Sequence, residues 1–239
     1  MTAKIIRCLA LLLFTACLAP HAWADGKYHY ADPAALHFEQ FLVQPPANDS
    51  SITKSELIGM LELQRLRTDA EIMRAKSEEH LAIGAFASTL GTWFDEKKLP
   101  LTAKLLTQVK EDCKLSSELQ KNYWNRPRPF ALEPRLHPCV EKPDNASYPS
   151  GHSELAVTWG LVLAELVPDE RQQILARAWQ VGDDRVLAGV HYPSDVAAGR
   201  LAAQELFELM QKSPEFQTDL AAAQREVAAA HPGKLSLAQ

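Results

Sequence analysis

Long apolar runs are missing from almost all of this sequence, which argues against an integral membrane protein. The longest run, residues 8–19, has about 12 residues, whereas a membrane-spanning helix needs roughly 20. We therefore expect no stable insertion into a membrane.

Positive charge is also scarce. Lys and Arg together number 25 and Asp and Glu number 30; without Lys4 and Arg7, 23 basic residues face 30 acidic ones, a net charge of −7. Because nucleic acids attract strongly basic surfaces, we expect no nucleic acid partner.

Signals of β structure are absent. The sequence has no alternating valine or isoleucine strands, no Asn-Gly hairpin signal and no internal repeat. These absences predict an all-α fold.

The first 24 residues read as a separate targeting segment. Lys4 and Arg7 precede the apolar run, and Ala22-Trp23-Ala24 fits the small-x-small rule for a cleavage site. We expect residues 1–24 to be a signal peptide, residues 25–239 to form one domain, and the protein to be periplasmic or secreted. A lipoprotein processed at Cys17 is the alternative.

Cysteine is nearly absent from the expected domain. Cys8 and Cys17 leave with the signal peptide, so only Cys113 and Cys139 remain. An even pair in an oxidising compartment favours a disulfide between them, with two unpaired buried thiols as the alternative.

Helical periodicity runs through most of the chain. A T-K-S-E sequence at Thr53 resembles a capping box, and proline, which disfavours helix, gathers in one loop where six of the fifteen prolines lie. The pattern predicts helices over residues 53–80, 81–94, 101–123, 155–166, 169–187, 193–212 and 213–230, an extended segment over residues 25–51, and a loop over residues 126–149. An exposed apolar face on the first or last helix would allow a homo-oligomer.

Basic side chains stand on both sides of the junction between helix and loop. Lys121 ends a predicted helix, and Arg128 is held between Pro127 and Pro129. Both can neutralise the oxygens of a phosphate group. We interpret the neighbouring Arg126 as solvated.

The sequence P-S-G-H stands at the start of the helix predicted over residues 155–166. Unpaired amides and the helix dipole favour an oxyanion there, and Gly151 lets the backbone approach closely. Ser150 adds a hydroxyl donor to this site, or it is an ordinary N-cap. His152 is placed to act as an acid.

The third block contains a histidine and a carboxylate four residues apart. Asp195 can accept from one nitrogen of His191, which fixes the tautomer and leaves the other nitrogen free to attack. Arg185, six residues before His191, can turn into the same pocket. These residues predict phosphoryl transfer with a histidine nucleophile.

The three blocks, K-x6-R-P, P-S-G-H and R-x5-H-x3-D, resemble the signature of the type 2 phosphatidic acid phosphatase and haloperoxidase superfamily. The chain looks most like the bacterial class A nonspecific acid phosphatases. The resemblance implies a helical bundle of that type and hydrolysis of small-molecule phosphomonoesters, without metal or other cofactor. It further implies that His191 is phosphorylated, that His152 protonates the leaving alcohol and that Asp195 orients His191. The phosphoryl oxygens would be held by Lys121, Arg128, Ser150, Gly151 and Arg185.

Other functions remain open from the sequence. A vanadium-dependent haloperoxidase, a phospholipid-phosphate phosphatase and a non-enzymatic phosphate-binding protein are the alternatives, and transfer of phosphate to alcohols is a further possible activity. Tyr123, Trp124 and Tyr148 flank the blocks and suggest a substrate mouth, with core packing as the alternative for Trp124. One residue departs from the family pattern, since Asp184 stands where the family has serine before the arginine. We expect Asp184 to point away from the phosphate.

Overall fold

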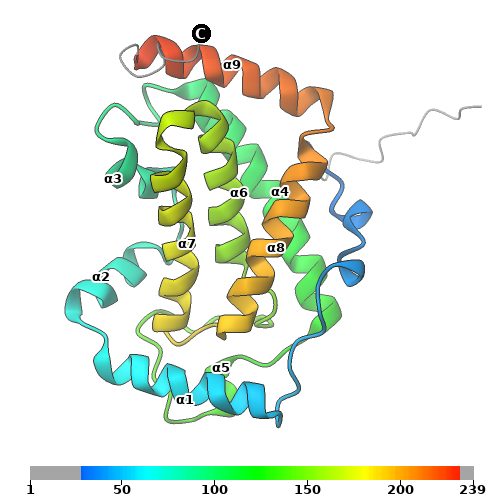
Figure 1. Ribbon diagram of the computed structural model, residues 1–239, viewed down its shortest axis with the longest axis vertical. Coiled ribbons are helices and arrows are strands. Elements are labelled where there is room, and N and C mark those ends of the chain that lie inside the picture. The colour runs from blue at the N-terminus through cyan, green and yellow to red at the C-terminus, as the bar shows by residue number, and fades with distance from the viewer. Residues whose placement is uncertain (1–27, 232–239) are drawn as a thin grey trace, which may run out of the picture.

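The computed structural model describes residues 28–231, and this part of the chain is helical with no β-strand (Figure 1). The all-α prediction is therefore confirmed for the described residues. The expected signal peptide, together with Cys8 and Cys17, lies outside them. No helix within residues 28–231 is long and apolar enough to cross a membrane.

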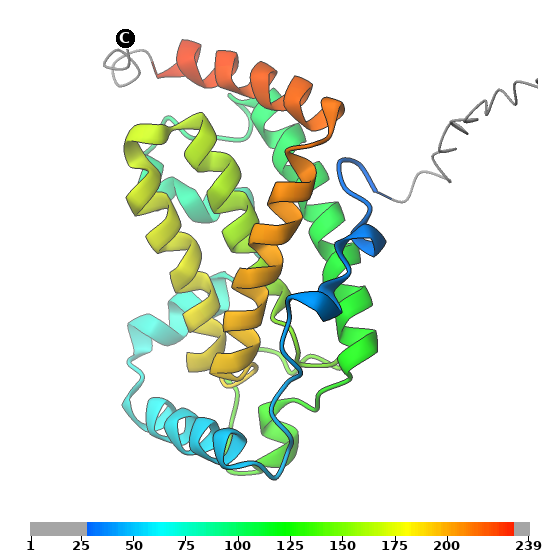
Figure 2. The same ribbon diagram turned by 45° about the vertical axis from the view of Figure 1, so that its right-hand side comes forward.

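Four long helices lie side by side and alternate in direction. They are α4 (Pro100–Trp124), α6 (Gly151–Leu166), α7 (Arg171–Leu187) and α8 (Pro193–Met210). Helix α9 (Pro214–Ala230) crosses one end of this bundle, and α1 (Ser51–Leu66) crosses the other, as both views show (Figures 1 and 2). The end covered by α1 is where α4 and α7 finish and where α6 and α8 begin.

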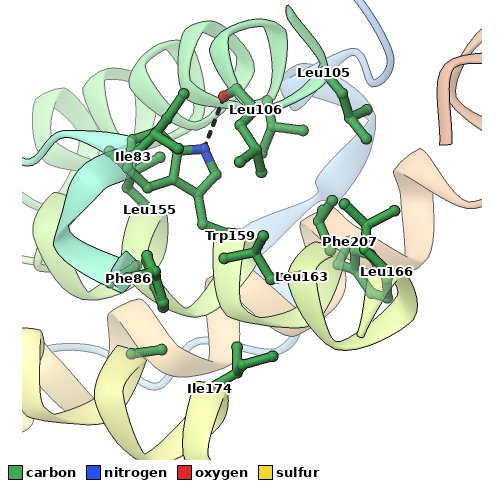
Figure 3. Close-up of a cluster of buried hydrophobic side chains, with 14 of the residues drawn as sticks. Ile83, Phe86, Leu105, Leu106, Leu155, Trp159, Leu163, Leu166, Ile174 and Phe207 are labelled. Atoms are coloured by element: carbon green, nitrogen blue, oxygen red, sulfur yellow. Dashed lines mark hydrogen bonds between the residues drawn. The ribbon is translucent and has the colours of Figure 1, made fainter. Parts of the chain in front are cut away.

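Helix α6 lies at the centre of the main core. Apolar side chains from α4, α6, α7, α8 and residues 83–86 form one cluster with Trp159, whose indole nitrogen donates to the Leu106 carbonyl at 2.8 Å (Figure 3). This bond satisfies the polar atom of a side chain that is only 1% exposed. The large buried apolar area fixes the positions of the helix ends that carry the predicted site.

The helices predicted over residues 101–230 agree with the structure to within a few residues at their ends. The proline-rich loop also agrees, with only the short α5 (Pro129–Leu132) inside it. The N-terminal segment has two short 3₁₀ turns, η1 (Pro33–Leu36) and η2 (Phe38–Gln40), and a third turn, η4 (Pro168–Glu170), precedes α7.

The helix predicted over residues 53–80 is wrong in two respects, because it starts earlier and is two helices. Helix α1 is capped by Ser50 rather than starting at Thr53, and it ends at Leu66. Thr68 then forms a capping box with Glu71 and starts α2 (Asp69–Ser77). A local start signal at Thr68 competes with continuation of the first helix, so the chain bends there.

The segment over residues 81–94 is not one helix, and only part of it is buried, at Leu81, Ile83, Phe86, Leu90 and Phe94. It contains η3 (Ile83–Phe86) and α3 (Ala87–Leu90), and then Gly91 takes a φ of 92°. This left-handed conformation suits glycine and ends the helical run.

The predicted disulfide is wrong. Cys113 and Cys139 are both free thiols. Cys113 lies on α4 in the main core, whereas Cys139 packs in a separate cluster with Ala188 and Val190. The two cysteines pack in different clusters, so their even number in the expected domain does not lead to a bond between them.

Candidate active site

Six of the eight predicted phosphate-handling residues line one cavity of about 720 Å³. Its lining residues come from the C-terminal halves of α4 and α7, the start of α6 and the neighbouring loops, so the cavity lies toward the end of the bundle where α4 and α7 finish. The six residues are Lys121, Arg128, Gly151, His152, Arg185 and His191. The other two, Ser150 and Asp195, are fully buried behind its wall.

His191 is buried between a carboxylate and a guanidinium. Its Nδ1 lies 3.3 Å from Oδ2 of Asp195, and its Nε2 lies 2.9 Å from Nη1 of Arg128. Arginine donates but cannot accept, so Nε2 is the unprotonated nitrogen and Nδ1–H donates to Asp195. Burial, together with the charges of Arg128 and Lys121, lowers the pKa of His191 well below its usual value. The ring is therefore neutral, with a lone pair on Nε2.

Asp195 receives hydrogen bonds on both oxygens. Oδ2 accepts from the Tyr192 amide at 2.9 Å and the Ser147 hydroxyl at 2.5 Å, in addition to His191. Oδ1 accepts from Nη1 of Arg126 at 2.6 Å. A fully buried carboxylate needs such partners, since an unpaired charge would be costly.

The prediction that Arg126 is solvated is wrong, because this residue is only 3% exposed. Its ion pairs with Asp195 and with Glu56 of α1 account for the burial. Glu56 is 70 positions earlier in the chain, so the local sequence carries no signal of this contact.

Lys121 and Arg128 are both held by backbone carbonyls of the proline-rich loop. Lys121 Nζ donates to the Ala146 carbonyl at 2.6 Å, and Arg128 Nε donates to the Asn145 carbonyl at 2.9 Å. Burial and the charge of Arg128 lower the pKa of Lys121 to about 7. Burial lowers the pKa of Arg128 to about 10. Two buried cations without a full complement of counter-charges are suited to an anion.

Arg185 reaches the cavity from α7. Its guanidinium donates to the Ala75 carbonyl and lies 3.6 Å from Glu78 Oε2. Burial lowers the pKa of Arg185 in spite of the neighbouring Glu78. Arg185 therefore adds a third cation to the wall, fixed by the C-terminal end of α2.

The P-S-G-H turn begins α6 as predicted. The Ser150 hydroxyl accepts from the Ser153 amide at 3.3 Å, so Ser150 is the N-cap of α6. The Ser150 amide donates to the Asp195 carbonyl at 3.0 Å, which ties this turn to the start of α8. A Cβ atom on Gly199 of α8 would lie 2.5 Å from the Ser150 carbonyl oxygen. Only glycine at position 199 permits this approach.

His152 lines the cavity from the first turn of α6. Its Nε2 lies 3.1 Å from the Glu79 carbonyl, which only accepts, so Nε2 carries a proton. Burial, and next the charge of Arg185, lower the pKa of His152 to about 4. His152 is therefore neutral at mildly acidic pH as long as no anion is bound.

The sequence did not point to the segment of residues 74–81, which we call the α2 strap. It supplies the carbonyls of Ala75 and Glu79 to Arg185 and His152. Arg74 of the strap binds both oxygens of Asp184 at 2.7 Å. Asp184 does not line the cavity, in agreement with the expectation that it points away. The hydrogen bonds from the strap to Arg185 and His152 use backbone carbonyls, which any residue type supplies, so these contacts leave no signal in the sequence.

A buried carboxyl group, Glu154, was also missed. It lies one turn beyond Gly151 on α6 and is fully buried. Burial raises the pKa of Glu154 to about 8, against the effects of Ser116 and Lys121. An acid in the first turn of a helix usually faces solvent, and so the sequence gives no sign of its burial.

The predicted substrate mouth of aromatic side chains is not found. Tyr148 and Trp124 pack with Leu42 in a separate apolar cluster, and the Tyr148 hydroxyl donates to the Val43 carbonyl at 2.6 Å. Tyr123 packs edge-on against Trp124. None of the three aromatic residues lines the cavity.

Comparison with known proteins agrees with this geometry. Residues 101–207 match the PAP2 superfamily, and all three sequence blocks fall within them. The non-specific acid phosphatase of Providencia stuartii is 35% identical to this chain over 198 residues, covering 78% of this chain and 79% of that protein.

Two solved structures share the fold. The transmembrane PAP2-type phosphatidylglycerolphosphate phosphatase of Bacillus subtilis has a TM-score of 0.53 and 22% identity, covering 75% of this chain and 94% of that one. A bacterial vanadium-dependent iodoperoxidase has a TM-score of 0.54 and 21% identity, covering 74% of this chain and 53% of that one.

This chain therefore has the PAP2 fold, and the fold brings its cations and two histidines together around one cavity. Within that superfamily, the chain belongs to the non-specific acid phosphatases.

Proposed function

We propose that this acid phosphatase hydrolyses phosphate monoesters through a phosphohistidine intermediate on His191. The observation that carries the proposal is the pair of contacts on the His191 ring. Nδ1 faces Asp195 at 3.3 Å, and Nε2 faces a phosphate-binding cation, Arg128, at 2.9 Å. When the phosphoryl oxygens of the substrate take over the hydrogen bond from Arg128, Nε2 has a free lone pair directed into a cationic cavity, and a neutral imidazole of this kind is a nucleophile for phosphorus.

In the first step, Nε2 of His191 forms a bond to phosphorus, and the bond from phosphorus to the ester oxygen breaks. The departing oxygen takes a proton from His152 and leaves as an alcohol. In the second step, water attacks the phosphohistidine and gives up a proton to the now neutral His152, and phosphate leaves with His191 restored. Lys121, Arg128 and Arg185 stabilise the charge on the phosphoryl oxygens throughout.

The proton on the leaving oxygen needs a source, because the pKa of free His152 is about 4. A phosphate monoester has a second pKa of about 6, so at mildly acidic pH the substrate brings a proton as its monoanion. Transfer of that proton to His152 yields an imidazolium beside a dianion. The dianion favours the charged ring, so substrate binding raises the pKa of His152. This account predicts an acidic optimum.

The wall beyond the phosphate-binding end is chemically mixed. Leu81, Val140 and Leu155 offer apolar surface, and Lys110, Lys114 and Glu118 offer charges of both signs. Such a wall suits small phosphomonoesters whose leaving groups vary, and it is not shaped for a single leaving group.

We also propose that the phosphohistidine can be attacked by an alcohol instead of water, which would make the protein a phosphotransferase. The same cavity that admits water to His191 admits a small alcohol, given its volume of about 720 Å³. Adding glycerol to the assay would then release less inorganic phosphate than leaving alcohol, whereas equal amounts would argue against transfer.

Export to the periplasm or the medium is a further proposal. It rests on the basic, apolar and small-residue pattern of residues 1–24. Expression of the full chain in a bacterium, followed by fractionation and N-terminal sequencing, tests it. A mature form that starts at Asp25 outside the cytoplasm is expected, and an uncleaved cytoplasmic chain would contradict it.

The proposed function is tested by measuring hydrolysis of p-nitrophenyl phosphate in the presence of a metal chelator. Wild-type protein should hydrolyse this substrate, vanadate should inhibit the reaction, and His191→Ala should lose activity. A fully active His191→Ala protein would overturn the mechanism. Halide oxidation with peroxide and vanadate, or activity confined to a phospholipid phosphate, would favour one of the alternative functions.

A further inference from the structure

Arg126 is buried beside the site but does not line the cavity. Its Nη1 donates to Asp195 Oδ1 at 2.6 Å and to the Ser194 hydroxyl at 2.8 Å. Its guanidinium carbon lies 3.7 Å from the centre of the Tyr192 ring. Arg128, two residues later, lines the cavity instead. Two arginines of one short motif thus do different things, and only one is placed to meet substrate.

The two oxygens of Asp195 are divided between two tasks. Oδ1 takes the charged hydrogen bond from Arg126, whereas Oδ2 accepts from His191 Nδ1 and from the Tyr192 amide. Because the carboxylate is planar, anchoring Oδ1 sets the direction in which Oδ2 points. The orientation of the His191 ring therefore depends on a residue that does not touch that ring.

Arg126 is itself fixed from the opposite side by α1. Glu56 accepts from Arg126 Nη2 at 3.1 Å through Oε2 and from the Ser194 amide at 2.7 Å through Oε1. The side chains of Arg126, Asp195 and Glu56 are 2%, 0% and 11% exposed. Water therefore screens these contacts little, and the guanidinium is held between the two carboxylates.

We propose that Arg126 is a positioning residue that acts through Asp195 to hold His191 ready for attack on phosphorus, with Glu56 as its anchor. This inference rests on the proposed phosphohistidine mechanism. It predicts that loss of Arg126 slows the chemical step and leaves substrate binding largely intact, because the phosphate-binding cations are untouched.

A double-mutant cycle with Arg126→Met and Asp195→Asn tests the inference. Each single variant should lower kcat by about 100-fold or more, as expected when a reacting group is misplaced by about 1 Å, with KM within about threefold of wild type. The double variant should be no slower than Asp195→Asn, since Arg126 has nothing left to act through. Losses that multiply, or an Arg126→Met variant with wild-type kcat, would overturn the inference.

Two further measurements keep the test decisive if Arg126→Met does not fold. Arg126→Lys keeps the charge but cannot reach Asp195, Ser194 and Glu56 together, so its kcat should fall while it remains folded. Nitrogen-15 NMR of His191 should show one tautomer, protonated at Nδ1, in wild type and a mixture in Arg126→Lys. An unchanged tautomer and unchanged kcat would contradict the role.

The matched control is Arg135→Met, since Arg135 is exposed and pairs only with Glu133. It should keep wild-type kcat and KM. Absence of phosphatase activity in wild type would overturn the proposed function itself. A different result would overturn the Arg126 inference alone. In that case wild type would be active and Asp195→Asn would lower kcat, but the double variant would show the product of the two single losses.

Discussion

The Nε2 atom of His191 lies 2.9 Å from Nη1 of Arg128, and the same guanidinium nitrogen donates to the Val190 carbonyl at 2.7 Å. The position that a phosphoryl group must occupy to be attacked by Nε2 is thus next to a fixed donor. Arg128 is held there by the backbone carbonyls of Asn145 and Val190, and no carboxylate among the described residues forms an ion pair with it, which leaves its charge for the substrate.

Replacing Arg128 with Met should therefore remove transition-state stabilisation as well as binding. We expect kcat to fall by about 100-fold to 1,000-fold, the usual cost of losing one donor to a developing negative charge. Arg128→Lys should recover little of this, because an ammonium cannot reach Nε2, Asn145 and Val190 together. Steady-state kinetics of the two variants checks this; an Arg128→Lys protein with wild-type kcat would show that charge alone matters.

The protonation of His152 should depend on whether an anion is bound. In the free protein, nitrogen-15 NMR should give a His152 midpoint near pH 4, because burial and Arg185 disfavour the imidazolium. Saturating vanadate should raise that midpoint, since a bound anion stabilises the charged ring. A midpoint above pH 6 in the free protein, or one that vanadate does not move, would contradict the proposed origin of the proton.

Anion binding should weaken as Lys121 loses its charge. Its pKa is lowered to about 7, so the cation is present below that pH and is lost above it. The inhibition constant for sulfate, whose own charge does not change in this range, should rise by about tenfold per pH unit above about pH 7.

Two variants serve as controls for this pH dependence. Lys121→Met should bind sulfate weakly at every pH and lack the steep rise. Glu154→Gln should keep the rise, which separates Lys121 from Glu154, whose pKa is raised to about 8. If the inhibition constant for sulfate did not change across pH 7 in wild type, the charge of Lys121 would not contribute to anion binding.

Gly199→Ala should disturb both stability and the site, because its Cβ would lie 2.5 Å from the Ser150 carbonyl. Helix α8 must move away from the P-S-G-H turn, at a cost of about 1–3 kcal/mol typical of overpacking. The midpoint temperature of thermal unfolding and kcat should both fall. Gly59→Ala is the matched control, since its Cβ meets nothing within 4 Å, and it should stabilise α1 by about 0.5–1 kcal/mol. Equal effects of the two variants would contradict the close-packing account.

Much of the fold could be predicted because the helices after residue 100 carry both periodicity and sharp ends. Pro100, Pro193 and Pro214 stand in the first turns of their helices, and proline fills the loop before Gly151. Before residue 100 the same reasoning failed, because Thr68 and Gly91 interrupt apolar patterns that continue across them. Periodicity does not report a change of direction at a single residue.

The residues that line the cavity could be predicted from their motifs, whereas their supports could not. His191 and Arg128 belong to local sequence patterns. The burial of Arg126 depends on Glu56, and the position of Arg185 depends on the Ala75 carbonyl, both far away in the chain. The free Cys113 and Cys139 were mispredicted for a similar reason, since a count of cysteines ignores which face of α4 is buried.

The central claim is that His191 carries the phosphoryl group between substrate and water. Rapid quenching of wild-type protein into base during turnover, followed by mass spectrometry of its peptides, tests this directly, because phosphohistidine survives alkali. The account predicts phosphate on the peptide that contains His191, lost in His191→Ala and increased in His152→Ala if release needs His152 as base. Full turnover without any phosphorylated His191, or phosphate on another residue, would contradict it.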